Sequence, residues 1–262
     1  MSSSYKVIAR RWRPQQFEEL VGQDHIVRTL RNAIEQGRIA HAYLFVGPRG
    51  TGKTSTARVF AKAVNCSNSE DGNPCDLCTT CEAINEGRFM DLIELDAASN
   101  RGIDEIRGIR DRVNLAPVEG SYKVYIIDES HMLTEHASNA FLKTLEEPPP
   151  HAIFILCTTE PHKILPTIIS RCQRFDFHRI TSDHMISRLK TVCDKEAINV
   201  DDDALMVLAK ASSGSLRDAE NLLEQVVVSY GQRIESTMVN SMLGWDRTDT
   251  AFEFVKSLLM LD

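Results

Sequence analysis

Short apolar runs recur along the first two thirds of the chain and predict buried strands. The candidate strands are Tyr43–Val46, Leu92–Leu95, Lys123–Ile127, Ile153–Cys157 and Arg174–Phe177. The first, the end of the third and the fourth are nearly all apolar, which is typical of strands buried on both faces of a sheet. Helical patterns separate the runs, for example at Ser55–Val64 and Ser138–Leu145. This alternation predicts an α/β fold with a parallel sheet covered by helices.

Beyond Phe177 the strand pattern stops and amphipathic helices follow one another. They are expected at Thr181–Lys195, Asp201–Ser212, Ser215–Tyr230 and Ser236–Leu243, and a further helix begins within Thr248–Met260. Thr181-Ser182-Asp183 and Asp201-Asp202-Asp203 supply the residue types of helix N-caps. The pattern therefore predicts an α/β domain over residues 1–178, a small helical domain over 179–243, and the start of a truncated third domain over 244–262.

Composition narrows the class of protein. The chain has 262 residues, of which 42% are hydrophobic and 26% charged, enough for one large core and a smaller second one. Its net charge of −7 argues against a broad basic surface for nucleic acid, although a local phosphate-binding patch is compatible with it. Met1 to Pro14 is polar and basic, and no apolar run approaches membrane-spanning length. We expect a cytoplasmic protein with no membrane partner.

The strongest chemical motif lies between the first strand and the next helix. Gly47-Pro48-Arg49-Gly50-Thr51-Gly52-Lys53-Thr54 fits the phosphate-loop pattern G-x-x-x-x-G-K-[ST] at every fixed position. Glycines let the backbone wrap a phosphate chain, and the amides that begin the helix, up to Ser55, point at the anion. Lys53 would reach the β- and γ-phosphates, while the Thr54 hydroxyl would ligate Mg²⁺. The alternative is a chance glycine-rich turn.

A second motif ends the strand Lys123–Ile127. The following Asp128-Glu129 has the form of a Walker B element, in which Asp128 holds Mg²⁺ through water and Glu129 acts as general base. The alternative is a solvated strand end, but the position after a phosphate loop in an alternating α/β segment favours the catalytic interpretation. His131 completes Asp128-Glu129-Ser130-His131 and is interpreted as a polar residue at the edge of the site.

Four of the seven cysteines cluster in sequence. They follow the pattern C-x8-C-x2-C-x2-C and are Cys66, Cys75, Cys78 and Cys81. Four thiolates this close can surround one tetrahedral Zn²⁺, and a site with four protein ligands is structural rather than catalytic. A disulfide pair and an iron–sulfur cluster are the alternatives; the absence of a secretory signal speaks against the first and the spacing against the second.

Three further residues are weaker candidates. Thr158, in Thr158-Thr159-Glu160-Pro161 at a strand end, could sense the γ-phosphate or is simply a strand terminus. Arg171, in Ser170-Arg171-Cys172, could be an arginine finger, although the residues alone favour an ordinary surface arginine. Arg217, in Gly214-Ser215-Leu216-Arg217-Asp218-Ala219, starts a helix and could fold onto the phosphates.

Taken together, these motifs carry a resemblance to a known family. The phosphate loop, the four-cysteine insert, the Walker B run, Phe141-Leu142-Lys143-Thr144-Leu145-Glu146-Glu147-Pro148-Pro149, the Ser-Arg-Cys segment and the run around Arg217 are similar to the gamma/tau (DnaX) subunits of the bacterial DNA polymerase III clamp loader, which are AAA+ ATPases. The opening Ala9–Phe17 and Val21-Gly22-Gln23 also match. One departure is Ser130, where the family usually has valine; both acids remain.

The resemblance implies an AAA+ fold with strand order 5-1-4-3-2, the zinc module at about residues 66–81, a helical lid over 179–243 and an oligomerising collar from 244. It implies that Val21 and its neighbours contact adenine, that Thr158 is sensor 1, that Arg171 acts in trans, and that Arg217 is sensor 2. The implied cofactors are ATP/ADP, Mg²⁺ and Zn²⁺. The implied partners are other clamp-loader subunits in a hetero-pentamer, a sliding clamp and primer–template DNA.

The expected function is therefore an ATP-driven motor that opens a ring-shaped clamp and places it on primed DNA. Ser99-Asn100-Arg101-Gly102 and the arginines that follow, Arg107, Arg110 and Arg112, are candidates for DNA contact; a solvated mixed-charge helix is the alternative. Two rival functions are another AAA+ DNA-remodelling ATPase, which has no reason to carry the cysteine insert, and a non-catalytic scaffold, against which Lys53, Thr54, Asp128 and Glu129 speak.

Overall fold

A computed structural model describes residues 7–100, 102–245, 256–258 and 260 of the chain. Within it the chain forms two compact units, one of residues 13–179 and one in which the N-terminal residues up to Trp12 join the residues from Ile180 onward. The helix expected at Thr248–Met260 falls mostly outside the described residues, as does Arg101.

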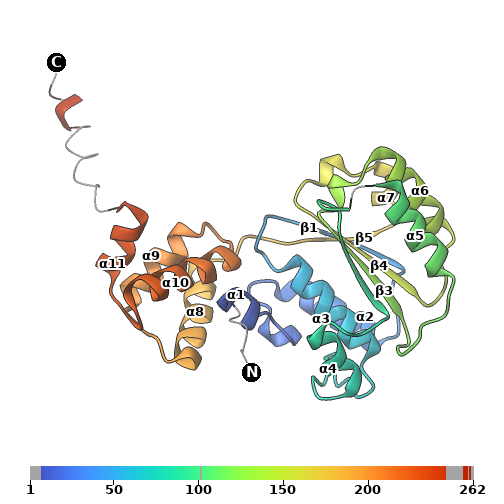
Figure 1. The fold of residues 1–262 in the computed structure, drawn as a ribbon, viewed down its shortest axis with the longest axis horizontal. Helices are drawn as coiled ribbons and strands as arrows, with labels where there is room; N and C mark the ends of the chain where they lie inside the picture. Colours follow the sequence, from blue (N-terminus) through green and yellow to red (C-terminus); the bar gives the residue numbers. More distant parts are fainter. Residues whose placement is uncertain (1–6, 101, 246–255, 259, 261–262) are drawn as a thin grey trace. The chain divides into compact units, whose positions relative to one another are not determined.

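The larger unit is built on a parallel sheet with strand order β2-β3-β4-β1-β5 (Figure 1). The strands are β1 (Ala42–Val46), β2 (Leu92–Asp96), β3 (Lys123–Asp128), β4 (Ala152–Thr158) and β5 (Gln173–Asp176). This confirms the order expected from the sequence. The chain crosses from one side of β1 to the other, so the carboxyl ends of β1 and β4 lie at a topological switch point, where open α/β sheets bind their ligands.

Helices cover both faces of this sheet (Figure 1). On one face α2 (Asp24–Glu35) and α3 (Lys53–Asn65) pack on β1, β3 and β4, and on the other face lie α5 (Ile103–Val113), α6 (Glu135–Glu146) and α7 (Pro166–Ile169). Along β1 the side chains alternate between the two cores: Tyr43 and Phe45 join the first, Leu44 and Val46 the second. Every residue of β1 is buried, which explains its continuous apolar run.

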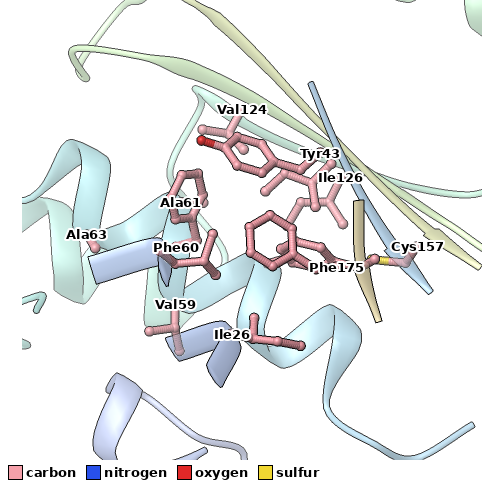
Figure 2. Close-up of a cluster of buried hydrophobic side chains, with 14 of the residues drawn as sticks. Ile26, Tyr43, Val59, Phe60, Ala61, Ala63, Val124, Ile126, Cys157 and Phe175 are labelled. Atoms are coloured by element: carbon pink, nitrogen blue, oxygen red, sulfur yellow. The ribbon is translucent and has the colours of Figure 1, made fainter. Parts of the chain in front are cut away.

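The first of these cores is rich in aromatic rings (Figure 2). The Tyr43 ring lies 4.9 Å from that of Phe60 on α3, in an edge-to-face arrangement, and Phe45 lies 5.8 Å from Phe175 on β5. Such ring pairs add stability beyond the area they bury. The Tyr43–Phe60 pair helps to fix α3, and with it the loop that precedes α3, against the sheet, and the Phe45–Phe175 pair joins β1 to β5.

The smaller unit is mainly helical. It contains α1 (Ile8–Arg11), α8 (Ser182–Glu196), α9 (Asp202–Ala211), α10 (Leu216–Tyr230) and α11 (Ser236–Leu243). Two features were not expected from the sequence. Two-residue strands, β6 (Asn199–Val200) and β7 (Arg233–Ile234), pair in parallel, and α1 packs here, with the amide of Ile8 donating to Glu224 Oε2 at 3.0 Å.

The predicted N-caps differ in their chemistry. The Thr181 hydroxyl accepts a hydrogen bond from the His184 amide, as a capping residue does. Asp201 stands at the N-cap position of α9, but its side chain makes no capping bond. Ser215 caps α10 by accepting from the Asp218 amide at 3.3 Å.

In the part of the chain that the structure describes, no helix combines the length and the apolar character needed to cross a bilayer.

Candidate nucleotide-binding site and cysteine cluster

The phosphate-loop residues connect the carboxyl end of β1 to α3. The backbone of the loop depends on glycine: Gly50 and Gly52 have φ 74° and 97°, and a Cβ on Gly47 would lie 2.5 Å from the Phe177 carbonyl oxygen. The Gly47 amide donates to the Thr158 carbonyl at 3.1 Å, which ties the loop to the end of β4. The first turn of α3 thus begins at Lys53, with its free amides at the loop, as anion binding needs.

Lys53 is held inside the loop. Its side chain is buried, and Nζ donates to the carbonyls of Gly47 and Pro48, each at 2.8 Å. Burial lowers the pKa of the ammonium, because the charged form loses solvation, while the nearby acids Glu129 and Asp128 oppose this. A cation in this position can meet the charge of a phosphate bound in the loop.

Thr54 and Asp128 meet although they are far apart in the sequence. The Thr54 hydroxyl, on the first turn of α3, donates to Asp128 Oδ2 at the end of β3 over 2.7 Å. A hydroxyl and a carboxylate are the hard oxygen ligands that Mg²⁺ takes in phosphate-loop ATPases. The donor set therefore fits the magnesium ion that the motifs imply.

Glu129, Thr158 and His131 lie beside this pair. Glu129 Oε2 is 3.5 Å from the Thr159 hydroxyl, which donates to it, and the imidazole of His131 is 3.1 Å from Thr158 Oγ1. His131 was expected at the site's edge, yet its side chain is only 6% exposed. Sequence reasoning missed its contacts, because the turn that folds it back over β4 is set by tertiary packing.

The other candidates are placed as follows. Arg171 follows α7; its Nη2 is 2.9 Å from Glu146 Oε1 and its Nη1 donates to the Thr167 carbonyl at 2.8 Å.

Val21, the candidate for adenine contact, is half-buried and lies two residues before Gln23. The buried amide of Gln23 exchanges hydrogen bonds with the backbone of His178. The sequence pointed to Gln23 only as part of the run Val21-Gly22-Gln23, and this contact with His178 was not expected. Arg217 lies in the helical unit, on the first turn of α10.

The segment expected to contact DNA starts at the carboxyl end of β2. Asp96 accepts hydrogen bonds from the Ala98 amide and the Ser99 hydroxyl, each at 2.9 Å, and so shapes the turn into α5. Asp96 pairs with Asp128 in the sheet register, so this turn begins beside the Walker B strand. Three exposed arginines follow on α5, at Arg107, Arg110 and Arg112.

The four clustered cysteines meet around one point. The sulfur atoms of Cys66, Cys75, Cys78 and Cys81 all lie within 4.8 Å of one another, and those of Cys66 and Cys78 are 3.9 Å apart. Tetrahedral zinc with Zn–S bonds of about 2.3 Å requires sulfur–sulfur distances of about 3.8 Å. The amides of Cys75 and Cys78 donate to Cys66 Sγ and Cys75 Sγ, each at 3.3 Å. The geometry fits a structural zinc site.

A buried lysine ties the cysteine module to the phosphate-loop helix. Lys62 of α3 is 1% exposed, and its Nζ lies 2.5 Å from Asp76 Oδ1. Asp76 belongs to the cysteine module, because it lies between Cys75 and Cys78 in the sequence. The same Nζ donates to Asn85 Oδ1 at 2.8 Å and to Gln15 Oε1 at 3.2 Å. The sequence indicates this link only weakly, because all it shows is that Lys62 lies on the phosphate-loop helix, one turn before Cys66.

Two family models match the chain. One, described as DNA polymerase III, delta subunit, covers residues 22–181, and the other, DNA polymerase III clamp loader subunit, ATPase lid domain, covers residues 184–233. The second match falls on the helical segment.

Curated relatives are similar over most of the chain. It is 57% identical over 228 residues to DNA polymerase III subunit tau of Bacillus subtilis, covering 87% of this chain and 40% of that protein. It is 45% identical to subunit tau of Escherichia coli, over 98% of this chain and 40% of that protein. Subunit gamma of Buchnera aphidicola is 42% identical over 99% of this chain and 71% of its own length. The chain thus spans about 40% of the length of the tau subunits.

Solved structures support the fold. The Thermotoga maritima RuvB Holliday junction branch migration motor aligns with a TM-score of 0.66 and 20% identity, covering 89% of this chain and 72% of that one. At this identity the likeness shows the architecture alone: a parallel sheet covered by helices, followed by a helical domain. Strand order, phosphate loop, cysteine cluster and sequence relatives agree, and the chain belongs to the gamma/tau family of DNA polymerase III subunits.

Proposed function

We propose that this chain is the ATP-binding and ATP-hydrolysing motor of a replicative clamp loader, which opens a sliding clamp and places it on primer–template DNA in the cytoplasm. The observation that carries the proposal is the hydrogen bond between Thr54 and Asp128, with Lys53 held in the loop and Glu129 next along the chain. A family member that serves only as a scaffold has no need to keep all four groups in place.

Each group has a separate task in hydrolysis. Lys53 and the amides at the start of α3 bind the β- and γ-phosphates of ATP, and Thr54 and Asp128 hold the metal ion. Mg²⁺ bound there neutralises charge that develops on the phosphate oxygens. Glu129 accepts a proton from the attacking water, while Thr158 orients the γ-phosphate as sensor 1. Val21 and its neighbours hold adenine, and Arg217 is the residue that we assign as sensor 2.

Arg171 would act on the ATP of a neighbouring subunit. Within the chain it pairs with Glu146, and the two side chains are 34% and 50% exposed. Exposed ion pairs contribute only about 0–1 kcal/mol, so Arg171 can leave Glu146 for a phosphate at little cost. An arginine that acts in this way needs a neighbouring subunit, so the proposal includes the other loader subunits of a hetero-pentamer. The zinc site has a structural role, since its four protein ligands leave no open position.

The rival motor function is less well supported. RuvB shares the fold at 20% identity, whereas the relatives at 42–57% identity are DNA polymerase III subunits. The deciding experiment measures the ATPase rate of the chain alone, with the other loader subunits, and after addition of clamp and primed DNA. A clamp loader requires stimulation that depends on both clamp and primer–template junction. Stimulation by DNA without any effect of the clamp would favour a translocating motor, and absence of ATP binding would favour a scaffold.

A further inference from the structure

His131 lies between two carboxylates and a hydroxyl group. Its Nε2 is 3.3 Å from Glu160 Oε1, and its Nδ1 is 3.1 Å from Thr158 Oγ1 and 3.5 Å from Glu129 Oε2. The residue sits in the 3₁₀ turn Ser130–Met132 directly after β3, and Ser130 fastens this turn to β4 by donating to the Cys157 carbonyl at 3.1 Å. The imidazole is thereby placed over the ends of two strands.

The acid that faces Nε2 is itself held in place. Glu160 Oε2 lies 2.8 Å from Lys163 Nζ, and the Glu160 amide donates to Thr158 Oγ1 at 3.0 Å. The hydrogen bond and charge of Lys163 lower the pKa of Glu160, so this carboxyl group stays ionised and can only accept. An acceptor thus faces Nε2 of His131 at 3.3 Å, so a proton on Nε2 has a partner there and Glu160 can orient the ring.

The other ring nitrogen decides where the Thr158 proton points. If Nδ1 is bare, it accepts the Thr158 hydroxyl proton, and that hydroxyl is turned toward the ring. If Nδ1 carries a proton, it donates to Thr158 Oγ1 or to Glu129, and the hydroxyl proton is free for another acceptor. One imidazole therefore contacts the hydroxyl proposed as sensor and lies beside the carboxylate proposed as general base.

We propose that His131 is a positioning residue for ATP hydrolysis, which orients the Thr158 hydroxyl through Nδ1, beside Glu129, while Glu160 orients the ring through Nε2. This inference rests on the proposed ATPase function. It explains why the side chain of His131, two residues after Glu129, is only 6% exposed. The two nitrogens of its ring face groups at the end of β3 and at the end of β4, so the ring joins the two strand ends. A polar residue at the rim of a site would be solvated instead.

The two ends of the ring can be tested separately. In His131→Asn the amide occupies the place of Nδ1, next to Glu129 and Thr158; in His131→Gln it reaches the place of Nε2, next to Glu160. His131→Ala removes both. The variants are compared in the assembly with the other loader subunits, clamp and primed DNA, by single-turnover ATP hydrolysis and by the dissociation constant for ATP.

We expect His131→Ala to lose on the order of tenfold to a hundredfold in hydrolysis rate, less than removal of a general base, with the ATP dissociation constant unchanged within about twofold. His131→Asn should recover part of this loss and His131→Gln should not. His162→Asn is the matched control, because His162 also approaches Glu160, at 3.7 Å, but is 73% exposed. It should hydrolyse ATP at the wild-type rate.

The outcomes separate the inference from the proposed function. Wild-type hydrolysis by His131→Ala would overturn the inference and leave the function intact. Equal losses in the Asn and Gln variants, together with weaker ATP binding and a lower melting temperature, would assign His131 a merely structural role and also overturn it. If the wild-type assembly itself failed to hydrolyse ATP, the proposed function would fall, and the inference with it.

Discussion

Glu129 adopts a backbone conformation that residues other than glycine seldom take. Its φ and ψ are 47° and 43°, in the left-handed region. Two local hydrogen bonds offset the strain of about 1–2 kcal/mol: the Glu129 amide donates to Asp128 Oδ1 at 3.0 Å, and its carbonyl accepts from the Met132 amide at 2.8 Å. Such conformations cluster at functional sites, and here the backbone itself directs the carboxylate.

The roles of Lys53 and Glu129 predict different phenotypes. Lys53→Ala should lose ATP binding, because the lysine stabilises phosphate charge in the ground state as well as in the transition state. Glu129→Gln should bind ATP normally and lose on the order of 10² to 10⁴ in hydrolysis rate, because the carboxylate is needed only when water attacks. Filter binding and single-turnover hydrolysis measure the two effects. Wild-type turnover in Glu129→Gln would exclude it as the general base.

A buried carboxylate outside the site predicts a dependence of stability on pH. Asp91 is fully buried, which by itself would raise its pKa, but the amides of Val118, Glu119 and Gly120 donate to it at 2.7–2.9 Å and the net shift is downward. Because the folded pKa lies below the unfolded value of about 3.9, this stabilisation is present above that value and is lost as pH falls through the folded pKa.

Asp91→Asn should therefore destabilise the protein by about 1–3 kcal/mol at pH 7. Hydrogen bonds to a charged acceptor are strong, and the substitution puts an NH₂ donor where a carboxylate oxygen accepted from backbone amides. Urea unfolding at neutral pH and near pH 3 measures the difference, which should shrink in acid. Asp111→Asn is a suitable control, because Asp111 is exposed on α5. A difference that stayed constant down to pH 3 would contradict the assignment.

At the scale of elements, the cysteine module should behave as a unit organised by metal. We expect about one Zn²⁺ per chain, because structural zinc contributes its binding energy to folding. Cys78→Ser should release the metal and loosen residues 66–86, while nucleotide affinity changes little. Elemental analysis and hydrogen exchange measure these effects. Cys193→Ser, which alters a buried thiol of the helical unit, should keep its zinc. Four reactive thiols in a folded, zinc-free protein would refute the metal site.

Lys62 predicts how this module is joined to α3. Lys62→Met keeps the length of the buried side chain but removes the charge that binds Asp76, Asn85 and Gln15. Removing one partner of a buried pair typically costs about 3–5 kcal/mol, and because Asp76 is 31% exposed we expect a smaller loss of about 1–3 kcal/mol. Zinc content should remain near one while hydrogen exchange in residues 66–86 speeds up. Unchanged exchange would show that Lys62 does not anchor the module.

At the scale of the whole molecule, Arg171 predicts a difference between the isolated chain and its assembly. Arginine fingers contribute on the order of 10³ to 10⁵ in rate, so a monomeric chain should bind ATP but hydrolyse it slowly. Arg171→Ala should then change little in the monomer and much in the assembly, where it silences the neighbour's site. ATPase assays on mixed assemblies measure this. Arg174→Ala is the matched control, since Arg174 is paired with Asp176 on β5. Equal loss in a strictly monomeric sample would place the arginine in cis.

The sequence by itself determined most of the architecture. Strands that are buried on both faces appear in the sequence as apolar runs, as β1 and β4 do. The phosphate loop is a contiguous stretch whose glycines and lysine act locally. The four cysteines are likewise close in sequence. In each case the physical requirement involves neighbouring residues, so a local pattern is enough to reveal it.

Only the tertiary structure decided which distant groups meet. The contacts of His131 with Thr158 and Glu160, of Lys62 with Asp76, and of Arg171 with Glu146 depend on how turns and helices pack, and no periodicity encodes them. The same holds for α1, which belongs to the helical unit, where the amide of Ile8 donates to Glu224 Oε2. Local patterns specify elements, whereas the partners of buried polar groups follow from satisfying each donor and acceptor in the folded chain.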